Sequence, residues 1–454
     1  MKKIHFIGIG GVGVSALAEI SLEGGDKVRG SDIRENSITR RLAKAGATVF
    51  IGHCAGNVGD ADVVVYSSAV PADNPELAIS REKNIPVLSR GEMLAEMMKE
   101  KTGIAVGGSH GKTTTTSMIA LILEKAGLSP TIAIGANVGH FSGNAKLGGG
   151  EYFVAEADES DGSFLYLAPK HCVITNIEKE HMDYYSEMVR VVDAYLEFLN
   201  KTSGVSFLCA DCPNVRRIAK KTKAKITTYG LWKNADLTAR DISLEGLISQ
   251  YEVLYKGRVL GNVKLAVPGV HNIVNSLAAL GVAMECGINF ETARDILSQY
   301  KGAERRFQVI SEKDAITIVD DYGHHPTEVK ATVAAAKQSK PERLIGIFQP
   351  HRYTRTLNLK EEFAAAFSGV DKLILTDVYA ACERPIQGVS ADLILQGVKR
   401  WGHKDAVYMP KDKIVDYLER IVKQGDFILF MGAGDIGNLA YELAGRAAVG
   451  SYNV

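Results

Sequence analysis

The chain has 454 residues, of which 46% are hydrophobic and 23% charged, so it is ordinary for a globular protein and too long for one compact core. Lys and Arg total 53 and Asp and Glu total 53, so the formal net charge is zero and the composition gives no sign of a nucleic-acid or membrane partner. We expect two or three domains. The 45 glycines, many at strand-to-helix corners, favour an α/β fold.

The first residues form a strand-like run, Ile4–Ile9, without the basic region and longer apolar core of a signal peptide. No apolar run is long enough to span a bilayer, and six scattered cysteines do not resemble a disulfide framework. Cys209 and Cys212 form a Cys-x-x-Cys with no second pair nearby, so we interpret them as incidental. We expect a cytoplasmic monomer or homodimer.

A first block, to about Glu100, alternates strands and helices and predicts a parallel sheet covered by helices. Its predicted elements are strand Ile4–Ile9, helix Ser15–Leu22 and strands Lys27–Ser31, Ala61–Tyr66 and Pro86–Leu88. Gly8-x-Gly10-x-x-Gly13 follows the first strand, and Asp32 lies near the distance of a ribose-binding acid. Such a turn brings backbone N–H groups to a diphosphate, which NAD and a UDP-sugar both contain.

The second block opens with Gly107-Gly108-Ser109-His110-Gly111-Lys112-Thr113, between the strand Ile104–Val106 and a helical pattern over Ser117–Gly127. Strand, glycine loop and helix are the context in which backbone N–H groups and the positive helix end surround phosphates. Lys112 would reach the β- and γ-phosphates, and the Thr113 hydroxyl would hold Mg²⁺. Val106 replaces the first glycine of the strict Walker pattern.

Acidic residues and a histidine follow the next two predicted strands, Tyr152–Ala157 and Cys172–Asn176. The first strand leads into four acids between Glu156 and Asp161, and the second into Glu178–Asp183, which includes His181. The carboxyl ends of parallel strands share one sheet edge, so these groups should lie beside Lys112. Carboxylates and an imidazole there predict a metal site, although a solvated acidic turn is the alternative for the acids.

Helix Met188–Leu199, shorter strands within Ile242–Leu265 and helix Asn272–Glu285 complete this block, and the third begins near Glu304. The third has predicted strands Ile316–Asp320, Leu344–Phe348, Lys372–Thr376 and Phe427–Met431, with helices between them, and again predicts a parallel sheet. Polar segments stand at its strand ends: residues 305–307, 320–326 and 348–356. They predict a cleft between domains, the alternatives being a surface ion pair or a solvated basic loop. For the second glycine turn, Gly432-x-Gly434-x-x-Gly437, a βα corner without ligand is the simpler interpretation.

At this point the chain resembles the Mur ligases, and within that family the branch that adds alanine. The resemblance covers essentially all of the chain and is carried by nine ordered motifs: residues 8–13, 107–116, 156–164, 176–183, 268–272, 305–307, 320–328, 348–356 and 432–437. Glu-Ala-Asp-Glu-Ser-Asp-Gly-Ser-Phe and Asp-Asp-Tyr-Gly-His-His-Pro-Thr-Glu are the stretches that indicate the alanine-adding branch.

The resemblance implies three α/β domains: a Rossmann-like UDP-sugar-binding domain (1–100), a central ATP-binding domain of P-loop ATPase type (101–303) and a Rossmann-like amino-acid-binding domain (304–454). It implies ATP-dependent ligation of L-alanine to UDP-N-acetylmuramate through an acyl phosphate, with Mg²⁺ or Mn²⁺, in peptidoglycan precursor synthesis. Closure of the domains is expected to exclude water from the acyl phosphate.

The family's site residues carry over position by position. The implied ATP contacts are Gly107, Gly108, Ser109, His110, Gly111, Lys112, Thr113, Thr114, His271, Asn272, Arg306 and Asp321. The implied UDP-sugar contacts are Gly10, Gly11, Val12, Gly13, Ser31, Asp32, Ser67, Arg90, Asp158, Glu159 and Ser160. The metal ligands are Thr113, Glu156 and His181, the catalytic set is Lys112, Glu156, His181 and Arg306, and the amino-acid contacts are His324, His351, Arg352 and Arg355.

Two departures from the family pattern stand out. Ser109 replaces a threonine common in the family, and the helix after His-Met-Asp lacks the lysine that sibling ligases carbamylate, as in the alanine-adding branch. The second metal's ligands and the base for the alanine ammonium therefore stay unassigned. Three other functions remain open: a nicotinamide-dependent dehydrogenase, a nucleotide switch without chemistry, and a sibling ligase for another amino acid or a peptide.

Overall fold

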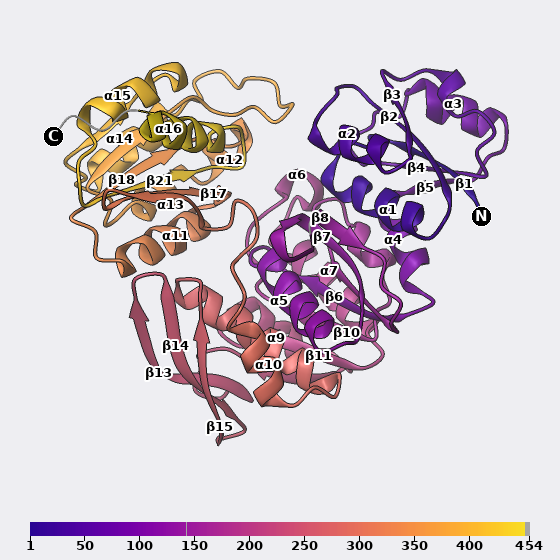
Figure 1. Cartoon of the computed structure of the whole chain (residues 1–454), viewed down its shortest axis with the longest axis horizontal. Helices are drawn as coiled ribbons and strands as arrows, with labels where there is room; N and C mark the ends of the chain where they lie inside the picture. Colours follow the sequence, from indigo (N-terminus) through magenta and orange to yellow (C-terminus); the bar gives the residue numbers. More distant parts are fainter. Residues whose placement is uncertain (142, 450–454) are drawn as a thin grey trace. The chain divides into compact units, whose positions relative to one another are not determined.

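The computed structural model describes residues 1–141 and 143–449, arranged around three separate sheets that make three α/β domains, as expected (Figure 1). The chain forms two compact units. The first holds residues 1–241, 251–263 and 274–300, and the second holds residues 242–250, 264–273 and the chain from Lys301 on. Among the described residues, none of the helices combines the length and apolar character that crossing a bilayer requires.

The N-terminal domain is a five-stranded parallel sheet in the order β3-β2-β1-β4-β5, in which every pair is parallel. Its strands are β1 (Lys3–Ile7), β2 (Lys27–Asp32), β3 (Thr48–Ile51), β4 (Val63–Tyr66) and β5 (Val87–Ser89). Its helices are α1 (Val12–Glu23), α2 (Ser37–Lys44), α3 (Pro75–Glu82) and α4 (Arg90–Met98). The order reverses direction at β1, so the glycine turn after β1 lies at the switch point where α/β sheets bind ligands.

The central domain is built on a ten-stranded sheet in the order β15-β14-β13-β12-β11-β10-β6-β9-β7-β8. Its strands are β6 (Thr102–Gly107), β7 (Thr131–Val138), β8 (Gly143–Lys146), β9 (Tyr152–Glu156), β10 (His171–Ile174), β11 (Val205–Cys209), β12 (Lys225–Tyr229), β13 (Leu237–Glu245), β14 (Ile248–Tyr255) and β15 (Arg258–Leu265). Its helices are α5 (Lys112–Lys125), α6 (Met182–Tyr185), α7 (Met188–Asn200), α8 (Pro213–Ala219), α9 (Val270–Glu285) and α10 (Phe290–Leu297). Because β6 lies between β10 and β9, the loops after all three strands emerge at one edge.

The C-terminal domain has a six-stranded sheet in the order β16-β17-β21-β18-β19-β20. Its strands are β16 (Gln308–Lys313), β17 (Ile316–Asp321), β18 (Arg343–Phe348), β19 (Lys372–Leu375), β20 (Ala406–Tyr408) and β21 (Asp426–Met431). Its helices are α11 (Pro326–Gln338), α12 (Tyr353–Asn358), α13 (Lys360–Ala366), α14 (Asp392–Arg400), α15 (Ile414–Ile421) and α16 (Gly437–Val449).

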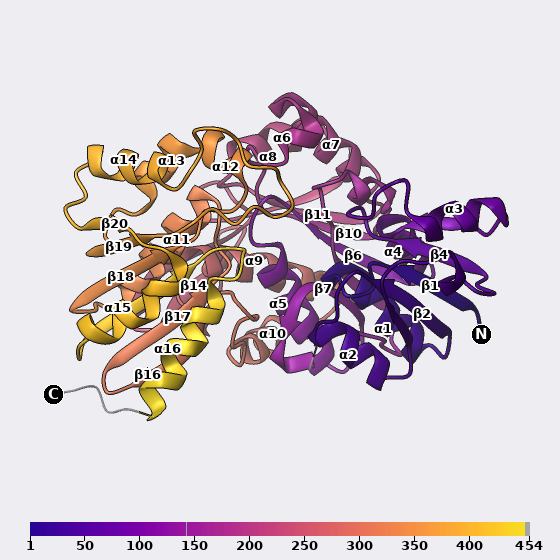
Figure 2. The same ribbon diagram turned by 90° about the horizontal axis from the view of Figure 1, so that it is seen from above.

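Alternating side chains of the buried strands give this sheet an apolar core on each face. In β21, Phe427 and Leu429 join the core formed with α11, α13 and α14, whereas Ile428 and Phe430 join the core formed with α15 and α16. Figure 2 shows α13 and α14 on one side of β18–β20 and α15 on the other. A strand buried on both faces reads as a continuous apolar run, which is why residues 427–431 were recognisable as a strand.

Element limits differ from the sequence expectation where glycine or strand pairing intervenes. The first strand ends at Ile7 rather than Ile9, because Gly8 takes a positive φ of 79° that no extended strand has. Helix α5 begins at Lys112, directly after Gly111 (φ 80°), rather than at Ser117. The predicted strands of the third sheet all pair parallel, and an additional edge strand, β16, pairs antiparallel with β17.

A buried carboxylate organises the carboxyl edge of the N-terminal sheet. Glu76, in the first turn of α3, is 0% exposed and accepts hydrogen bonds from the side chains of His5, Ser31 and Asn57 and from the Cys54 N–H. Burial alone would raise its pKa, but these four donors lower the pKa of Glu76 to about 2. The domain therefore depends on this group being ionised.

Replacing Glu76 should change how the stability of the protein depends on acid. With a pKa near 2 in the folded chain against 4.5 in the unfolded one, ionised Glu76 contributes stability above pH 4.5, which is lost as the pH falls toward 2. We expect Glu76→Gln to lower the free energy of unfolding at pH 7 by about 3 kcal/mol and to flatten its decline between pH 4.5 and 2. Urea unfolding followed by circular dichroism at several pH values measures both. Equal acid sensitivity of the two proteins would contradict this role.

Candidate active site

The loop between β6 and α5 is shaped by contacts to the strand beside it. Ser109 N–H donates to the Asn176 carbonyl (3.1 Å), and His110 N–H donates to the Asn176 side-chain oxygen (2.8 Å). The Thr175 hydroxyl donates to the His110 carbonyl (2.5 Å). Because Thr175 and Asn176 directly follow β10, the end of one strand holds the glycine loop that follows its neighbour.

Two glycines are required in this loop. Gly108 has φ 137°, and a Cβ there would lie 1.9 Å from the Thr175 hydroxyl oxygen. Gly111 has φ 80°, and its Cβ would lie 2.7 Å from an Asn275 side-chain oxygen. The close approach leaves the backbone open at the start of α5, whose first residues, Lys112 and Thr113, are those expected at the phosphates.

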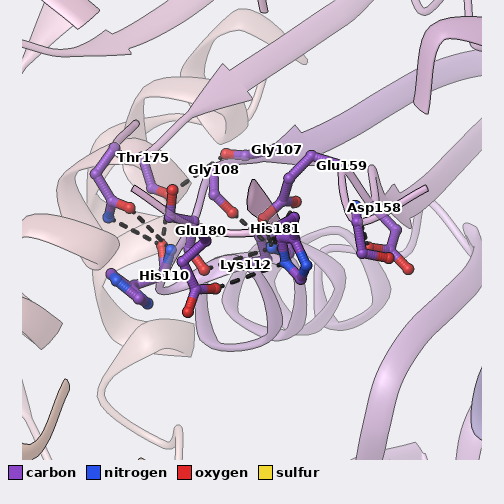
Figure 3. A network of polar contacts seen from close by, with 12 residues as sticks. Gly107, Gly108, His110, Lys112, Asp158, Glu159, Thr175, Glu180 and His181 are labelled. Atoms are coloured by element: carbon purple, nitrogen blue, oxygen red, sulfur yellow. Dashed lines mark hydrogen bonds and ion pairs between the residues drawn. The ribbon is translucent and has the colours of Figure 1, made fainter. Parts of the chain in front are cut away.

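Lys112 lies against a buried acid. Its ammonium group donates to both carboxylate oxygens of Glu159 (2.7 and 2.9 Å) and to the Gly108 carbonyl (2.6 Å), as Figure 3 shows. Burial disfavours the charged form of Lys112 and would lower its pKa. The negative charges of Glu159 and Asp158 outweigh this effect and raise the pKa of Lys112. The lysine is therefore a fixed cation at the mouth of the loop.

His181 stands beside the same acid. Its Nε2 lies 3.8 Å from a Glu159 oxygen and 3.6 Å from a Glu180 oxygen, and one ligand atom from each of the three residues lies within 4.8 Å of the others (Figure 3). His181 has a left-handed backbone (φ 53°), a costly conformation for a non-glycine residue that often marks a functional site. Two carboxylates and one imidazole are a donor set that suits Mg²⁺ or Mn²⁺.

Glu156 has a different partner from the one its motif suggested. Its side-chain oxygen accepts the Gly135 N–H (2.6 Å). Glu159, expected at the UDP-sugar, instead lies against Lys112 and next to His181. The structure thus brings His181 together with Glu159 and Glu180, and the assignment of Glu156 as a metal ligand stays a prediction.

Arg90 links the acidic turn to the N-terminal glycine turn. Its guanidinium donates to Asp158 (3.0 Å) and to the Ser163 hydroxyl (3.1 Å), and a Cβ on Gly13 would lie 2.8 Å from its Cδ. Arg90 and Lys112 lower the pKa of Asp158 although burial opposes this. Asp158 and Glu159 are consecutive, so one turn binds Arg90 of the N-terminal domain and Lys112 of the central domain.

The N-terminal glycine turn leaves a helix start available. Gly8 and Ile9 N–H groups donate to the Ser31 carbonyl (2.8 and 3.0 Å), and Gly10 N–H donates to Asp32 (2.9 Å). Helix α1 then begins after Gly11 with no side-chain cap and no acid in its first turn, which favours an anion. Ser31, predicted at the UDP-sugar, is 0% exposed, and its role stays a prediction.

The remaining residues implied by the resemblance take varied positions in the first unit. Ser67 caps a turn by accepting the Ala69 N–H (3.3 Å), and the N–H of Ser160 donates to Asp158 (3.1 Å). His110 Nε2 lies 3.4 Å from Glu178, and Thr114 lies in the first turn of α5.

In the second unit, two arginines pack on one ring. The guanidinium groups of Arg305 and Arg306 lie 5.0 and 5.1 Å from the Tyr322 ring centroid. Arg305 is bound to buried Asp320 (3.0 Å) and the Gly432 carbonyl, so it is structural.

The other residues expected at the nucleotide lie nearby in the chain or before the third sheet. Asp321 is buried and accepts hydrogen bonds from Phe307 N–H, Gly323 N–H and the Thr332 hydroxyl. The Asn272 side chain donates to the Pro268 carbonyl (2.7 Å), and His271 beside it is exposed.

The residues expected to bind the amino acid lie together at the carboxyl edge of the third sheet. The rings of His324 and His351 are 5.4 Å apart, and an Arg355 nitrogen lies 3.0 Å from His351 Nδ1. Arg352 has a strained backbone (φ 69°) and pairs with Glu383 (3.3 Å).

Sequence reasoning missed two members of this cluster, both in the loop after β19. Tyr379 stacks on His351 at 5.6 Å, with the rings 10° apart. The Glu383 carboxylate binds Arg352 and accepts from the Thr354 hydroxyl (2.6 Å). Both follow a buried strand, so the strand-end rule applied to β19 could have found them.

Comparison with known proteins gives three family models in the expected order. Residues 3–102 match the Mur ligase family catalytic domain, residues 106–283 the Mur ligase middle domain, and residues 305–434 the Mur ligase glutamate ligase domain. The chain is 49% identical over 440 residues to a UDP-N-acetylmuramate–L-alanine ligase from Geobacter sp. (strain M21), covering 96% of this chain and 95% of the relative.

A solved structure that is similar to this chain supports the same family assignment. UDP-N-acetylmuramate-alanine ligase MurC from Thermotoga maritima has a TM-score of 0.84 and 30% identity, covering 99% of this chain and all of that one. A murein peptide ligase from Psychrobacter arcticus shares the fold, with a TM-score of 0.72 at 23% identity over the full length of both chains. The first glycine turn is therefore that of a ligase and not of a dehydrogenase.

Gly108→Ala tests the geometry of the phosphate loop. The new Cβ would meet the Thr175 oxygen in a backbone conformation that alanine rarely adopts, so we expect the free energy of unfolding to fall by about 2 kcal/mol and kcat/KM for ATP at least about tenfold. Gly149→Ala is the matched control, since its Cβ would enter open space. Steady-state kinetics and thermal unfolding measure both effects. Wild-type kinetics for Gly108→Ala would contradict the assigned loop geometry.

Proposed function

Because the chain belongs to the Mur ligase family, we propose that it joins L-alanine to UDP-N-acetylmuramate with ATP, releasing ADP and phosphate, in the synthesis of peptidoglycan precursors. One observation carries the proposal on the structural side. Arg90, beside the N-terminal glycine turn, and Lys112, in the phosphate loop, bind consecutive acids. In the proposal, the diphosphate site and the triphosphate site would therefore adjoin one acidic turn.

ATP is needed because a carboxylate is a poor electrophile. In the proposed reaction the γ-phosphoryl group moves to the lactyl carboxylate of the muramate, which makes an acyl phosphate with a good leaving group. The alanine amine attacks its carbonyl, and phosphate leaves. Such a transfer needs positioning and charge stabilisation more than covalent help from the protein.

The phosphate loop supplies that stabilisation. Lys112 would exchange the Glu159 carboxylate for the β- and γ-phosphate oxygens, with Gly107–Thr114 around them. From the second unit, Arg306 would contact the γ-phosphate, Asp321 the ribose, and His271 and Asn272 the adenine. Arg306 fits this role because its ion-pair contact to Glu328 is long (3.8 Å), so a phosphate can replace it.

The acidic cluster fits a divalent cation, as its two carboxylates and imidazole indicate. We assign Thr113, Glu156 and His181 as ligands, with Glu159 and Glu180 within reach of His181. A bound Mg²⁺ or Mn²⁺ would neutralise the charge that develops between the β- and γ-phosphates. The Glu159 and Glu180 carboxylates lie 3.8 and 3.6 Å from His181 Nε2, so they would face the same ion.

The UDP-sugar and L-alanine would bind at the carboxyl edges of the N-terminal and the C-terminal sheet. The start of α1, with Gly10–Gly13 and Arg90, would hold the UDP diphosphate, and Asp32 its ribose. Arg352 and Arg355 would bind the alanine carboxylate through their guanidinium forks, next to His324 and His351.

An isotope-labelling experiment tests the proposed acyl phosphate directly. With UDP-N-acetylmuramate labelled with heavy oxygen in the lactyl carboxylate, one labelled oxygen should appear in each phosphate released, because the acyl phosphate loses it on amide formation. Phosphate release should require both UDP-N-acetylmuramate and L-alanine. Mass spectrometry of the phosphate and a panel of alanine, serine, glycine, glutamate and a tripeptide provide the measurement. Unlabelled phosphate would rule out the acyl phosphate, and release with the tripeptide alone would indicate a sibling ligase.

Arg355→Ala tests the amino-acid subsite. Loss of a charged hydrogen bond to the alanine carboxylate should raise the KM for alanine about tenfold to a hundredfold and leave the KM for ATP within about twofold. Arg420→Ala, an exposed arginine on α15 bound to the Asp416 carbonyl, is the control. An Arg355→Ala enzyme whose KM for ATP rises as much as that for alanine would speak against a carboxylate contact.

A further inference from the structure

His53 lies at the carboxyl edge of the N-terminal sheet, two residues after β3. The Gly52 N–H donates to the Asp32 carbonyl (2.8 Å), which fixes the start of this loop beside the end of β2. The His53 side chain is 17% exposed. Within residues 1–141 and 143–449, no side chain or backbone group bonds its Nε2 atom.

The other ring nitrogen of His53 belongs to the network around Glu76. Ser31 Oγ lies 3.0 Å from His53 Nδ1 and 2.5 Å from Glu76 Oε2. His5 Nε2 lies 3.0 Å from the same carboxylate oxygen, and Cys54 N–H and Asn57 donate to the other one. Glu76 is ionised at neutral pH and can only accept.

Counting protons fixes the direction of each bond. The Ser31 hydroxyl has one proton, and the Glu76 carboxylate takes it. Ser31 can then only accept from His53, so His53 Nδ1 carries the N–H. A neutral imidazole has one N–H, and Nε2 is therefore left with a lone pair. The buried Glu76 carboxylate, linked to His53 through two hydrogen bonds, thus makes the Nε2 atom of His53 a hydrogen-bond acceptor.

We infer that His53 is a specificity-determining residue for the nucleotide base, its Nε2 accepting the N3–H of uracil. The inference rests on the proposed function, because it takes the ligand to be a UDP-sugar. Ser31 and Glu76 are positioning residues that act through His53. Cytosine has a lone pair at N3, and facing the Nε2 lone pair it would be repelled.

The order of the strands places the base near His53. Under the proposed function the diphosphate would lie at the start of α1 after β1, and Asp32, at the end of β2, would bind the ribose. The strand beyond β2 is β3, at the sheet edge. A base that continues past the ribose in the same direction therefore meets the loop after β3, which contains His53.

Equilibrium binding of nucleotides to the full-length protein tests this without turnover. UDP, CDP and 2′-deoxy-UDP are titrated calorimetrically at pH 8, without ATP, against wild type, His53→Leu and His53→Gln. Leucine removes the acceptor, whereas the glutamine oxygen can lie near the position of Nε2. Asp60→Asn, an exposed acid of the same domain that pairs with Lys3, is the control, and thermal unfolding checks each variant.

We expect wild type to prefer UDP over CDP, and His53→Leu to weaken UDP binding about tenfold without weakening CDP binding, since leucine also removes the repulsion of cytosine. His53→Gln should recover part of the preference. Equal losses for UDP and CDP, a loss for UDP but not for 2′-deoxy-UDP, or no loss would each overturn the inference. If wild type selects UDP and ligates alanine while His53→Leu behaves like wild type, only the inference fails. If wild type binds neither nucleotide, the proposed function fails with it.

Discussion

The two neighbouring carboxylates Asp158 and Glu159, each bound to a cation, are the constraint on which the site depends. Removing a charge from water costs several kcal/mol, which Lys112 offsets for the buried Glu159, whereas the half-buried Asp158 pairs with Arg90. Arg90 begins α4 of the N-terminal domain and Lys112 begins α5 of the central domain. Their shared acidic turn therefore ties together the glycine loops of two domains within the first unit.

This arrangement also explains how the Lys112 charge is accommodated in the loop. An unpaired lysine at the mouth of the loop would be a costly buried charge, and the Glu159 carboxylate compensates it. Under the proposed function a phosphate would compete with Glu159 for Lys112. Glu159 also lies 3.8 Å from His181, so the same acid belongs to both the lysine pair and the acidic cluster.

The sequence predicted the three sheets and most strand-end loops because buried parallel strands read as apolar runs and ligand groups follow them. It could not predict the partners of side chains. Glu159 follows β9 by three residues, as its motif suggests, but only packing shows that it faces Lys112. His5 and Glu76 are 71 positions apart and their bond forms only because β1 and α3 meet in the fold. Tyr379 and Glu383 were not predicted as site residues, because the segment after β19 matches no short motif.

The two glycine turns show why a motif needs its surroundings. Gly8–Gly13 and Gly432–Gly437 fit the same pattern, yet different side chains lie beside them. At the first, an arginine crosses Gly13 and the helix start has no acid in its first turn, which favours a diphosphate. At the second, a Cβ on Gly437 would lie 2.5 Å from the Asp320 carboxylate, and the Tyr379 ring packs against Gly434. The side chains of Asp320 and Tyr379 fill the space beside Gly437 and Gly434, so these glycines are explained by close packing of β17, β18 and the loop after β19. A glycine motif therefore has to be interpreted together with the side chains that pack against it.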